Sequence, residues 1–167
     1  MKMLKLVVII VAMTLSASGF SQDKGAGKAA TADKGMKNME ILRDKLKADK
    51  KLVVAANMKL TDAEGKGFWP VYDAYQKDLG AINDRMVKAV MGYADAYNKG
   101  PVSNEAAKKL LTEALAIEDA ELKLKREYVV KLEKVLPDVK VALYMQIENK
   151  IRALLRFELA ANIPLVE

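Results

Sequence analysis

The chain of 167 residues contains no cysteine and no histidine, and it has only four prolines and one tryptophan. Without cysteine it has neither a disulfide nor a nucleophilic thiol, so apolar packing must hold the fold together. Without histidine it lacks the commonest general base and a principal zinc ligand. It also contains no glycine-rich phosphate loop and no G-x-S-x-G motif. These absences predict a protein that is not an enzyme and that holds neither a metal ion nor a cofactor.

Few side chains remain as candidates for chemistry. Glu118 and Glu121 lie among apolar positions, where they are either buried acids or residues at the edge of the apolar stripe that reach solvent. We expect the second, because glutamate is rarely fully buried. The nine methionines are interpreted as adaptable core residues, since a copper site built on them would need other soft ligands nearby.

The N-terminus has the three parts of a secretory signal peptide. Lys2 and Lys5 form a basic region, residues 6–15 are almost entirely apolar, and residues 16–19 are small. The apolar run is too short to span a membrane comfortably, which takes about 20 residues. No second long apolar run follows. We therefore predict a signal peptide at 1–19, export to a bacterial periplasm, and no stable membrane insertion.

The rest of the chain divides in two. Residues 20–35 are rich in glycine, alanine, lysine and aspartate, which predicts a disordered leader, and residues 36–167 suit one helical domain. The whole chain carries a net charge of +6, part of it in the signal peptide. No dense basic stripe is present, so we expect no nucleic-acid partner. Weak attraction to acidic or unfolded proteins is left open by this charge.

Apolar periodicity predicts an all-α fold. The expected helices are about 36–57, 62–97, 104–136 and 138–161. The short connection between the second and third predicts a long antiparallel hairpin, and the whole an elongated four-helix bundle. The second helix has a heptad seam in two phases, formed by Phe68, Tyr75, Ile82, Ala89 and Ala96 and by Tyr72, Leu79, Met86 and Tyr93.

The third and fourth helices have broader patterns. One apolar face of the third is marked by Ala107, Leu110, Leu111, Ala114, Ile117, Leu124, Tyr128 and Val135, and a neighbouring one by Leu115, Leu122, Val129 and Leu136. The inward positions expected for the fourth are Val139, Leu143, Ile147, Ile151, Leu154 and Leu155. Glu148 and Arg152 have the favourable i, i+4 order of a pair on one helix.

The start of the second helix raises a specific question. Thr61 and Glu64 have the spacing of a capping box, yet Pro70 follows only six residues later. We predict one kinked helix that starts at the cap, with its bend between Lys66 and Pro70. The alternative is a separate capped turn, followed by a main helix beginning near Gly67.

Aromatic residues cluster just after this cap. Phe68, Tyr72 and Tyr75 follow the heptad seam and are expected in the core. Trp69 lies one position off the seam, so it packs against the first or the fourth helix or stands at the rim. Trp69 is therefore a candidate partner-binding residue.

The fourth helix carries four basic residues, Lys140, Lys150, Arg152 and Arg156. They form either a solvated face or a concave basic surface for client proteins. We take all four as candidate partner-binding residues.

Several stretches resemble a known family. Leu60, Thr61 and Glu64, in the stretch LTDAE, resemble the LTxxQ motif of the Spy/CpxP-like periplasmic proteins, with Glu in place of Gln. Residues 102–106 occupy a comparable place at the third helix, and residues 136–138 open the fourth. FWPVYDAY, LTEALAIEDAELKLKREY, VLPDVKVALYMQIENKI and IPLV resemble uncharacterised bacterial members of similar length.

This resemblance implies a homodimeric periplasmic stress protein that binds unfolded or envelope proteins without ATP, as a chaperone does. Two alternatives stay open. One is a regulatory partner of an envelope sensor protein. The other is a structural coiled-coil adaptor that self-associates through the seam of the second helix.

Overall fold

The computed structural model describes residues 48–166. The predicted signal peptide, the leader at 20–35 and the beginning of the first predicted helix at 36–47 lie outside the described residues. Within 48–166 there is no strand, so the predicted all-α bundle is confirmed. Its elements are a helical segment at 48–58, α3 (Asp62–Asn98), α4 (Asn104–Leu132) and α5 (Asp138–Asn162).

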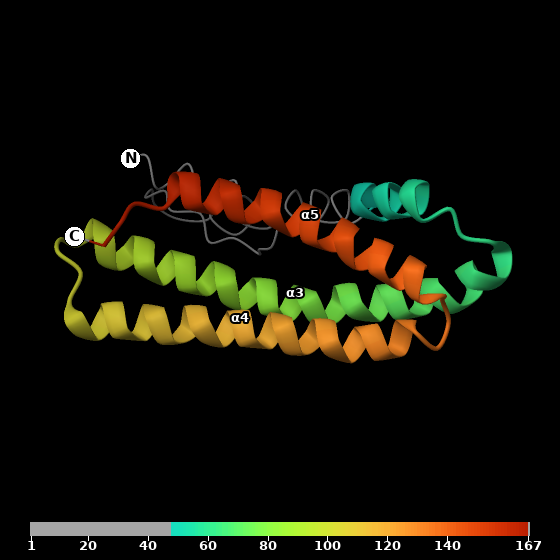
Figure 1. Cartoon of the computed structure of the whole chain (residues 1–167). Coiled ribbons are helices and arrows are strands. Elements are labelled where there is room, and N and C mark those ends of the chain that lie inside the picture. Colours follow the sequence, from blue (N-terminus) through green and yellow to red (C-terminus); the bar gives the residue numbers. More distant parts are fainter. Residues whose placement is uncertain (1–47, 167) are drawn as a thin grey trace, which may run out of the picture.

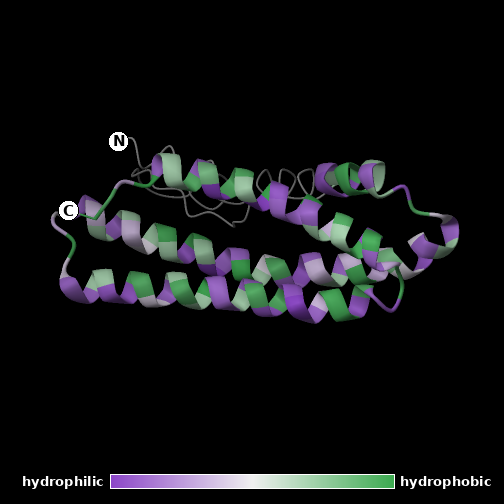
Figure 2. Ribbon diagram, viewed as in Figure 1, coloured by the Kyte–Doolittle hydropathy of each residue, from purple (hydrophilic) through white to green (hydrophobic). Residues whose placement is uncertain are grey.

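The bundle is elongated and built on a hairpin. Figure 1 shows α3 and α4 side by side and antiparallel, with α5 returning along α3 in the same direction as α3. The 37 residues of α3 correspond to about 55 Å of helix. The C-terminal tail returns to the far end of α3, where the Tyr93 hydroxyl donates to the Pro164 carbonyl over 3.0 Å. Apolar and polar residues interleave along every helix (Figure 2).

The N-terminus of α3 has the capping box that the sequence predicts. The Thr61 hydroxyl accepts from the Glu64 amide at 3.3 Å, and the Glu64 carboxylate accepts from the Thr61 amide at 2.8 Å. From this cap the helix continues without interruption through Pro70 to Asn98. The single-helix prediction is therefore correct, and the alternative start near Gly67 is wrong. Figure 1 shows the first turns of α3 curving away from the axis of the rest.

Gly67 lets the turn after α4 approach α3 closely. A Cβ atom at position 67 would lie 2.9 Å from the Cβ of Val135, closer than side chains tolerate. Val135 lies in the turn between α4 and α5. The glycine is therefore needed for packing and not for an unusual backbone conformation.

We expect Gly67→Ala to lower the free energy of unfolding by about 1–3 kcal/mol, the usual cost of overpacking. This is expected although alanine favours a helix over glycine by about 1 kcal/mol. Gly92→Ala is the matched control, because a Cβ there meets nothing within 4 Å. The control should stabilise the protein by about 0.5–1 kcal/mol. Urea denaturation measures both, and equal stabilisation by the two variants would contradict the close contact.

The core is centred on aromatic side chains. Phe68, Tyr72 and Tyr75 of α3 are buried, as predicted, and pack with Tyr128 of α4 and Tyr144 of α5. The ring centroids of Tyr75 and Tyr128 are 5.2 Å apart, and those of Phe68 and Tyr144 are 5.1 Å apart, both edge to face. Such pairs add to the stabilisation that burial alone provides.

The heptad seam of α3 holds only over its first half. Beyond Ile82 the predicted Tyr93 is buried, but the predicted Met86, Ala89 and Ala96 are only partly buried. The other buried positions are Val87, Val90 and Ala94. A straight α-helix drifts by about 20° per heptad relative to a strict seven-residue repeat. The repeat therefore predicts the near end of the seam correctly, and at the far end it is confirmed only at Tyr93.

α4 ends at Leu132 and not at 136. Residues 133–136 form a turn in which the amides of Val135 and Leu136 both donate to the Leu132 carbonyl at 2.9 Å. Leu136 precedes Pro137, and the residue before a proline is driven away from the helical conformation.

Each of the two predicted apolar faces of α4 is only partly covered. The first is buried at Ile117, Leu124 and Tyr128 but exposed at Leu111, and the second is buried at Leu136 but exposed at Leu115 and Leu122.

α5 is rotated relative to the prediction. Val139 and Leu154, both expected inward, are 79% and 70% exposed. The residues that α5 buries are Val141, Tyr144, Ile147, Glu148, Arg152 and Leu159. Ile147 is buried as predicted, and Leu143, Ile151 and Leu155 are partly buried. The prediction is wrong at Val139 and Leu154. It also paired Glu148 with Arg152, whereas each of these finds its partners on other helices.

Candidate functional site

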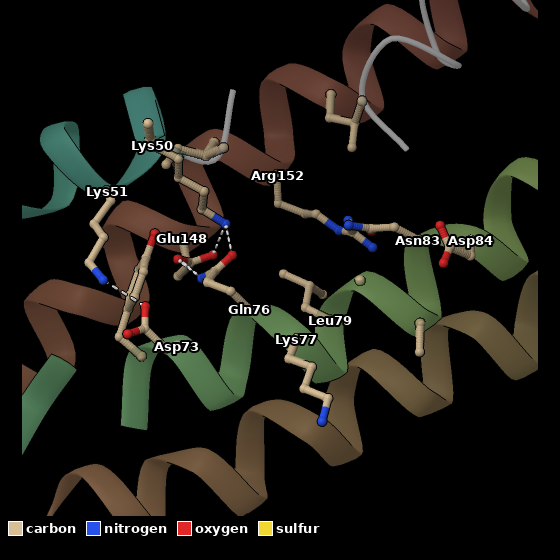
Figure 3. A pocket seen from close by; sticks show the side chains of 16 residues that line it. Lys50, Lys51, Asp73, Gln76, Lys77, Leu79, Asn83, Asp84, Glu148 and Arg152 are labelled. Atoms are coloured by element: carbon tan, nitrogen blue, oxygen red, sulfur yellow. Dashed lines mark hydrogen bonds and ion pairs between the residues drawn. The ribbon is translucent and has the colours of Figure 1, made fainter. Parts of the chain in front are cut away.

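A hydrogen-bonded polar cluster lies between the helical segment 48–58, α3 and α5. The buried Glu148 carboxylate accepts from Lys50 Nζ at 2.8 Å and from Gln76 Nε2 at 2.9 Å. Gln76 Nε2 also donates to the Tyr144 hydroxyl at 3.2 Å, and Lys50 Nζ donates to Gln76 Oε1 at 2.8 Å. Figure 3 shows Lys50 and Gln76 converging on Glu148 from opposite sides. These bonds offset the cost of burying the carboxylate.

A second cluster joins α4 to α5. Glu121 of α4 is only 3% exposed and forms an ion pair with Arg152. Its other oxygen accepts from Arg156 Nη2 at 2.7 Å. Arg152 also donates to Asn83 of α3. The expectation that Glu121 reaches solvent is wrong, because two arginines pair with it. Glu118, one turn earlier, is exposed as expected.

The contact between Arg152 and Glu121 is ionic in character. Arg152 Nε and Glu121 Oε1 form an ion pair, yet neither atom has a partner with hydrogen-bond geometry. Arg152 Nη2 is also buried without such a partner. Both side chains are buried, and opposite charges attract each other more strongly there than at the surface.

A groove of about 760 Å³ opens beside the first cluster, between residues 48–51, α3 and α5. Leu79, Ile151 and Leu155 supply its apolar walls. Its polar and charged lining includes Lys50, Lys51, Asp73, Lys77, Asn83, Asp84, Glu148 and Arg152 (Figure 3). The size falls in the range of ligand pockets. Apolar walls with charges of both signs suit a chain segment of mixed composition.

The perturbed pKa values near the groove belong to core tyrosines. Burial, followed by the negative charge of Glu148, raises the pKa of Tyr72, Tyr75 and Tyr144. These phenols therefore stay protonated at neutral pH and do not act as bases there. At the cap, hydrogen bonding from Lys140 lowers the pKa of Glu64.

Trp69 lies where the first helix meets α3, one of the places that the sequence allowed. Its ring is partly buried and packs edge to face on Phe68 and Tyr72, with centroids 4.9 and 5.4 Å apart. Lys51 Nζ of the helical segment 48–58 lies 5.1 Å from its centroid. Trp69 lies outside the groove and lines a second hollow with Leu60, Thr61 and Pro70.

The four basic residues of α5 do not share one surface. Lys140 binds Glu64 of the capping box at 2.5 Å, Lys150 is exposed, Arg152 is buried and Arg156 pairs with Glu121. Both the single solvated face and the concave basic surface are therefore wrong. Only Arg152 lines the groove.

Gln76, Asn83 and Lys50 were not among the site residues expected from the sequence. A signal for two of them existed, because Gln76 and Asn83 are seven residues apart and thus share one face of α3 next to the apolar seam. Polar side chains at such positions indicate a cross-helix network, since buried polar groups need partners. Nothing in the sequence indicates that Lys50 pairs with Glu148, 98 residues away.

Comparison with known proteins adds no assignment to this geometry. The chain matches no protein-family model, no curated protein and no solved structure. Over residues 48–166, no group of three or more Asp and Glu side chains is arranged as a metal site. In the same part of the chain, none of the helices combines the length and apolar character needed to cross a bilayer.

Proposed function

We propose that this chain is a periplasmic envelope-stress protein of the Spy/CpxP-like type, which binds non-native or partner proteins without ATP. The observation that carries the proposal is the α3–α5 groove, with its apolar walls and a rim of both charges. Export rests on the signal peptide at 1–19. The family resemblance rests on Leu60, Thr61 and Glu64 and on the longer stretches that accompany them.

The groove offers contacts suited to an unfolded segment. Ile151 and Leu155 provide apolar contact, and Leu154, 70% exposed, extends this surface because it follows Ile151 by three residues on the helix. Each apolar side chain transferred from water contributes roughly 1.5–3 kcal/mol when it is fully buried. A few such contacts, partly made, give weak and reversible binding. Release then needs no nucleotide.

The exposed charges beside the groove favour association with client proteins without selecting one particular partner. Lys51 pairs with Asp73 across 2.8 Å, and both are substantially exposed. The pair is therefore worth little to stability and can exchange its partner for a client's charge. The net positive charge of the chain favours acidic unfolded proteins. Salt should weaken this attraction, since it screens exposed charges.

The chaperone activity is tested with an unfolded client that aggregates on dilution. We expect the mature chain, at stoichiometric amounts, low salt and without ATP, to slow the rise in light scattering. Leu154→Glu should reduce this suppression several-fold, because it places a charge on the apolar surface beside the groove. Val139→Glu is the matched control on the same helix, 79% exposed in its first turn. Failure of the wild-type chain to slow aggregation rejects the proposal.

The same experiment separates the alternatives. A regulatory partner of an envelope sensor would form one saturable complex and leave generic clients unaffected. A structural adaptor would self-associate and ignore unfolded chains. Dimerisation is proposed at this point from the family resemblance alone, which does not identify the surface through which two copies would pack.

A further inference from the structure

The outward face of α4 carries an uncovered apolar row. Leu111, Leu115 and Leu122 are 61%, 54% and 49% exposed. Their spacing of four and seven residues places them on one side of the helix. Val129, seven residues after Leu122, lies at the end of this row, where it is partly buried and packs against the main core cluster. The buried residues of α4, such as Ile117 and Tyr128, lie on a neighbouring face of the helix. Single exposed leucines are ordinary, but a contiguous row points to a partner.

The seam that the sequence suggested for self-association is not free. Phe68, Tyr75 and Ile82 of α3 are buried within the chain, in the main core cluster. A second copy has no access to them without unfolding the bundle. Any contact between copies must use a face that the fold leaves exposed, and the row on α4 is such a face.

The charges beside this row are arranged symmetrically about Leu122. Glu118 and Asp119 precede it by four and three residues, and Lys125 and Arg126 follow it by three and four. Glu118, Asp119 and Arg126 are exposed and Lys125 is partly exposed. Glu118 has an ion-pair contact of 3.8 Å with Arg156, both ends of which are largely in solvent. A contact of this kind is weak and leaves Glu118 able to pair elsewhere.

We propose that a second copy of this chain packs antiparallel on α4, with a two-fold axis at Leu122. In this register Leu122 meets its own counterpart, and Leu115 faces the second copy's Val129 position. Glu118 and Lys125 lie on one side of the leucine row, seven residues apart, and Asp119 and Arg126 lie on the other. The two-fold axis brings the Glu118 position next to the Lys125 position of the second copy and the Asp119 position next to its Arg126 position, so four ion pairs form across the interface. A parallel arrangement would instead place like charges opposite one another, which disfavours it.

The arrangement accounts for the exposed row and the charge order together. The contact from Leu115 to Val129 spans 14 residues, or about 21 Å of helix. One helix from each copy gives an interface at the small end of specific ones, so the dimer should depend on concentration. The groove between α3 and α5 lies on other elements and stays accessible in this dimer.

The first test is the solution mass of the mature chain over a concentration series, by light scattering or sedimentation. We expect a dimer that dissociates on dilution. Leu122→Glu should weaken it about a hundredfold, because two leucines are lost and two carboxylates meet at the axis. Val139→Glu, on α5, should leave the mass unchanged. A monomer at every concentration, or a dimer that Leu122→Glu does not weaken, overturns the proposal.

Charge exchange tests the register independently of apolar burial. The variant Glu118→Lys with Asp119→Lys should be monomeric, and so should Lys125→Glu with Arg126→Glu. Mixing these two variants should restore a dimer, and so should all four changes in one chain. Failure of either restoration, with helical content intact by circular dichroism, contradicts the antiparallel register. Aggregation suppression by the same variants is scored separately, since loss of the dimer does not alter the groove.

Discussion

Replacing Glu121 by alanine is expected to lower the free energy of unfolding by about 3–5 kcal/mol, as removal of one partner from a buried ion pair does. Glu121 is 3% exposed, and it is the carboxylate that faces Arg152 from α4. Arg152 is itself buried, so its guanidinium would lose its counter-charge without gaining water. Arg156 is half exposed and can turn to solvent, so the penalty falls on Arg152.

Urea denaturation followed by circular dichroism measures this effect. Glu118→Ala is the matched control, since Glu118 is exposed, lies on the same helix and contacts Arg156 only at 3.8 Å. Its cost should be about 0–1 kcal/mol. The double variant Glu121→Leu with Arg152→Met should recover most of the loss, because apolar residues of similar size can replace a buried pair. Equal costs for Glu121→Ala and Glu118→Ala would contradict the buried pair.

The fold was predictable because its signals are local. The cap at Thr61 and Glu64, the stop at Asn98 and the break at Pro137 each depend on a few neighbouring residues. Helix ends and the hairpin follow from them. The continuation of α3 through Pro70 was also predicted, because the capping box at Thr61 and Glu64 places the start of the helix before the proline.

The rotation of α5 was not predictable from apolar spacing. That reasoning assigns every charge to the outside, yet Glu148 and Arg152 are inside and Leu154 is outside. Glu148 is held inward by Lys50 and Gln76, and Arg152 is held inward by Glu121. Such partners come from distant parts of the chain, and no local rule identifies them.

The same reasoning explains why the basic surface was wrong. Four cations on one helix appear equivalent in sequence, but Lys140 is held by Glu64, 76 residues away, and Arg156 by Glu121. Glu64 and Glu121 thus neutralise two of the cations that were expected to contact a client protein. The groove depends on how the helical segment 48–58, α3 and α5 are placed relative to one another, so the sequence alone could not predict it.

Loss of stability above about pH 10 is the second large effect expected, from the ordinary phenol pKa. In the folded state burial, followed by the charge of Glu148, raises the pKa of Tyr72, Tyr75 and Tyr144. A group whose folded pKa lies above its unfolded value contributes stability that is fully present below the unfolded pKa. That contribution is lost as the pH rises toward the folded pKa.

The size of this effect follows from the number of phenols. Each tyrosine that stays neutral in the fold and ionises on unfolding costs about 1.4 kcal/mol per pH unit. The three together cost about 4 kcal/mol per unit above pH 10, enough to unfold a domain of ordinary stability within a few units. Tyrosinate absorbance should therefore rise together with the loss of helical signal.

Removing one hydroxyl identifies the cause of the alkaline transition. Tyr75→Phe keeps the ring and its edge-to-face contact with Tyr128, whose centroid is 5.2 Å away, but it deletes one ionisable group. Unfolding free energies measured in urea at pH 10, 11 and 12 should fall less steeply for this variant, with a difference that approaches about 1.4 kcal/mol per pH unit. An identical slope in the two proteins would contradict ionisation of Tyr75 as a cause of the alkaline transition. Glu148 binds Lys50 beside the groove and also opposes ionisation of the core tyrosines. We therefore expect the groove and the aromatic core to unfold in the same transition at high pH.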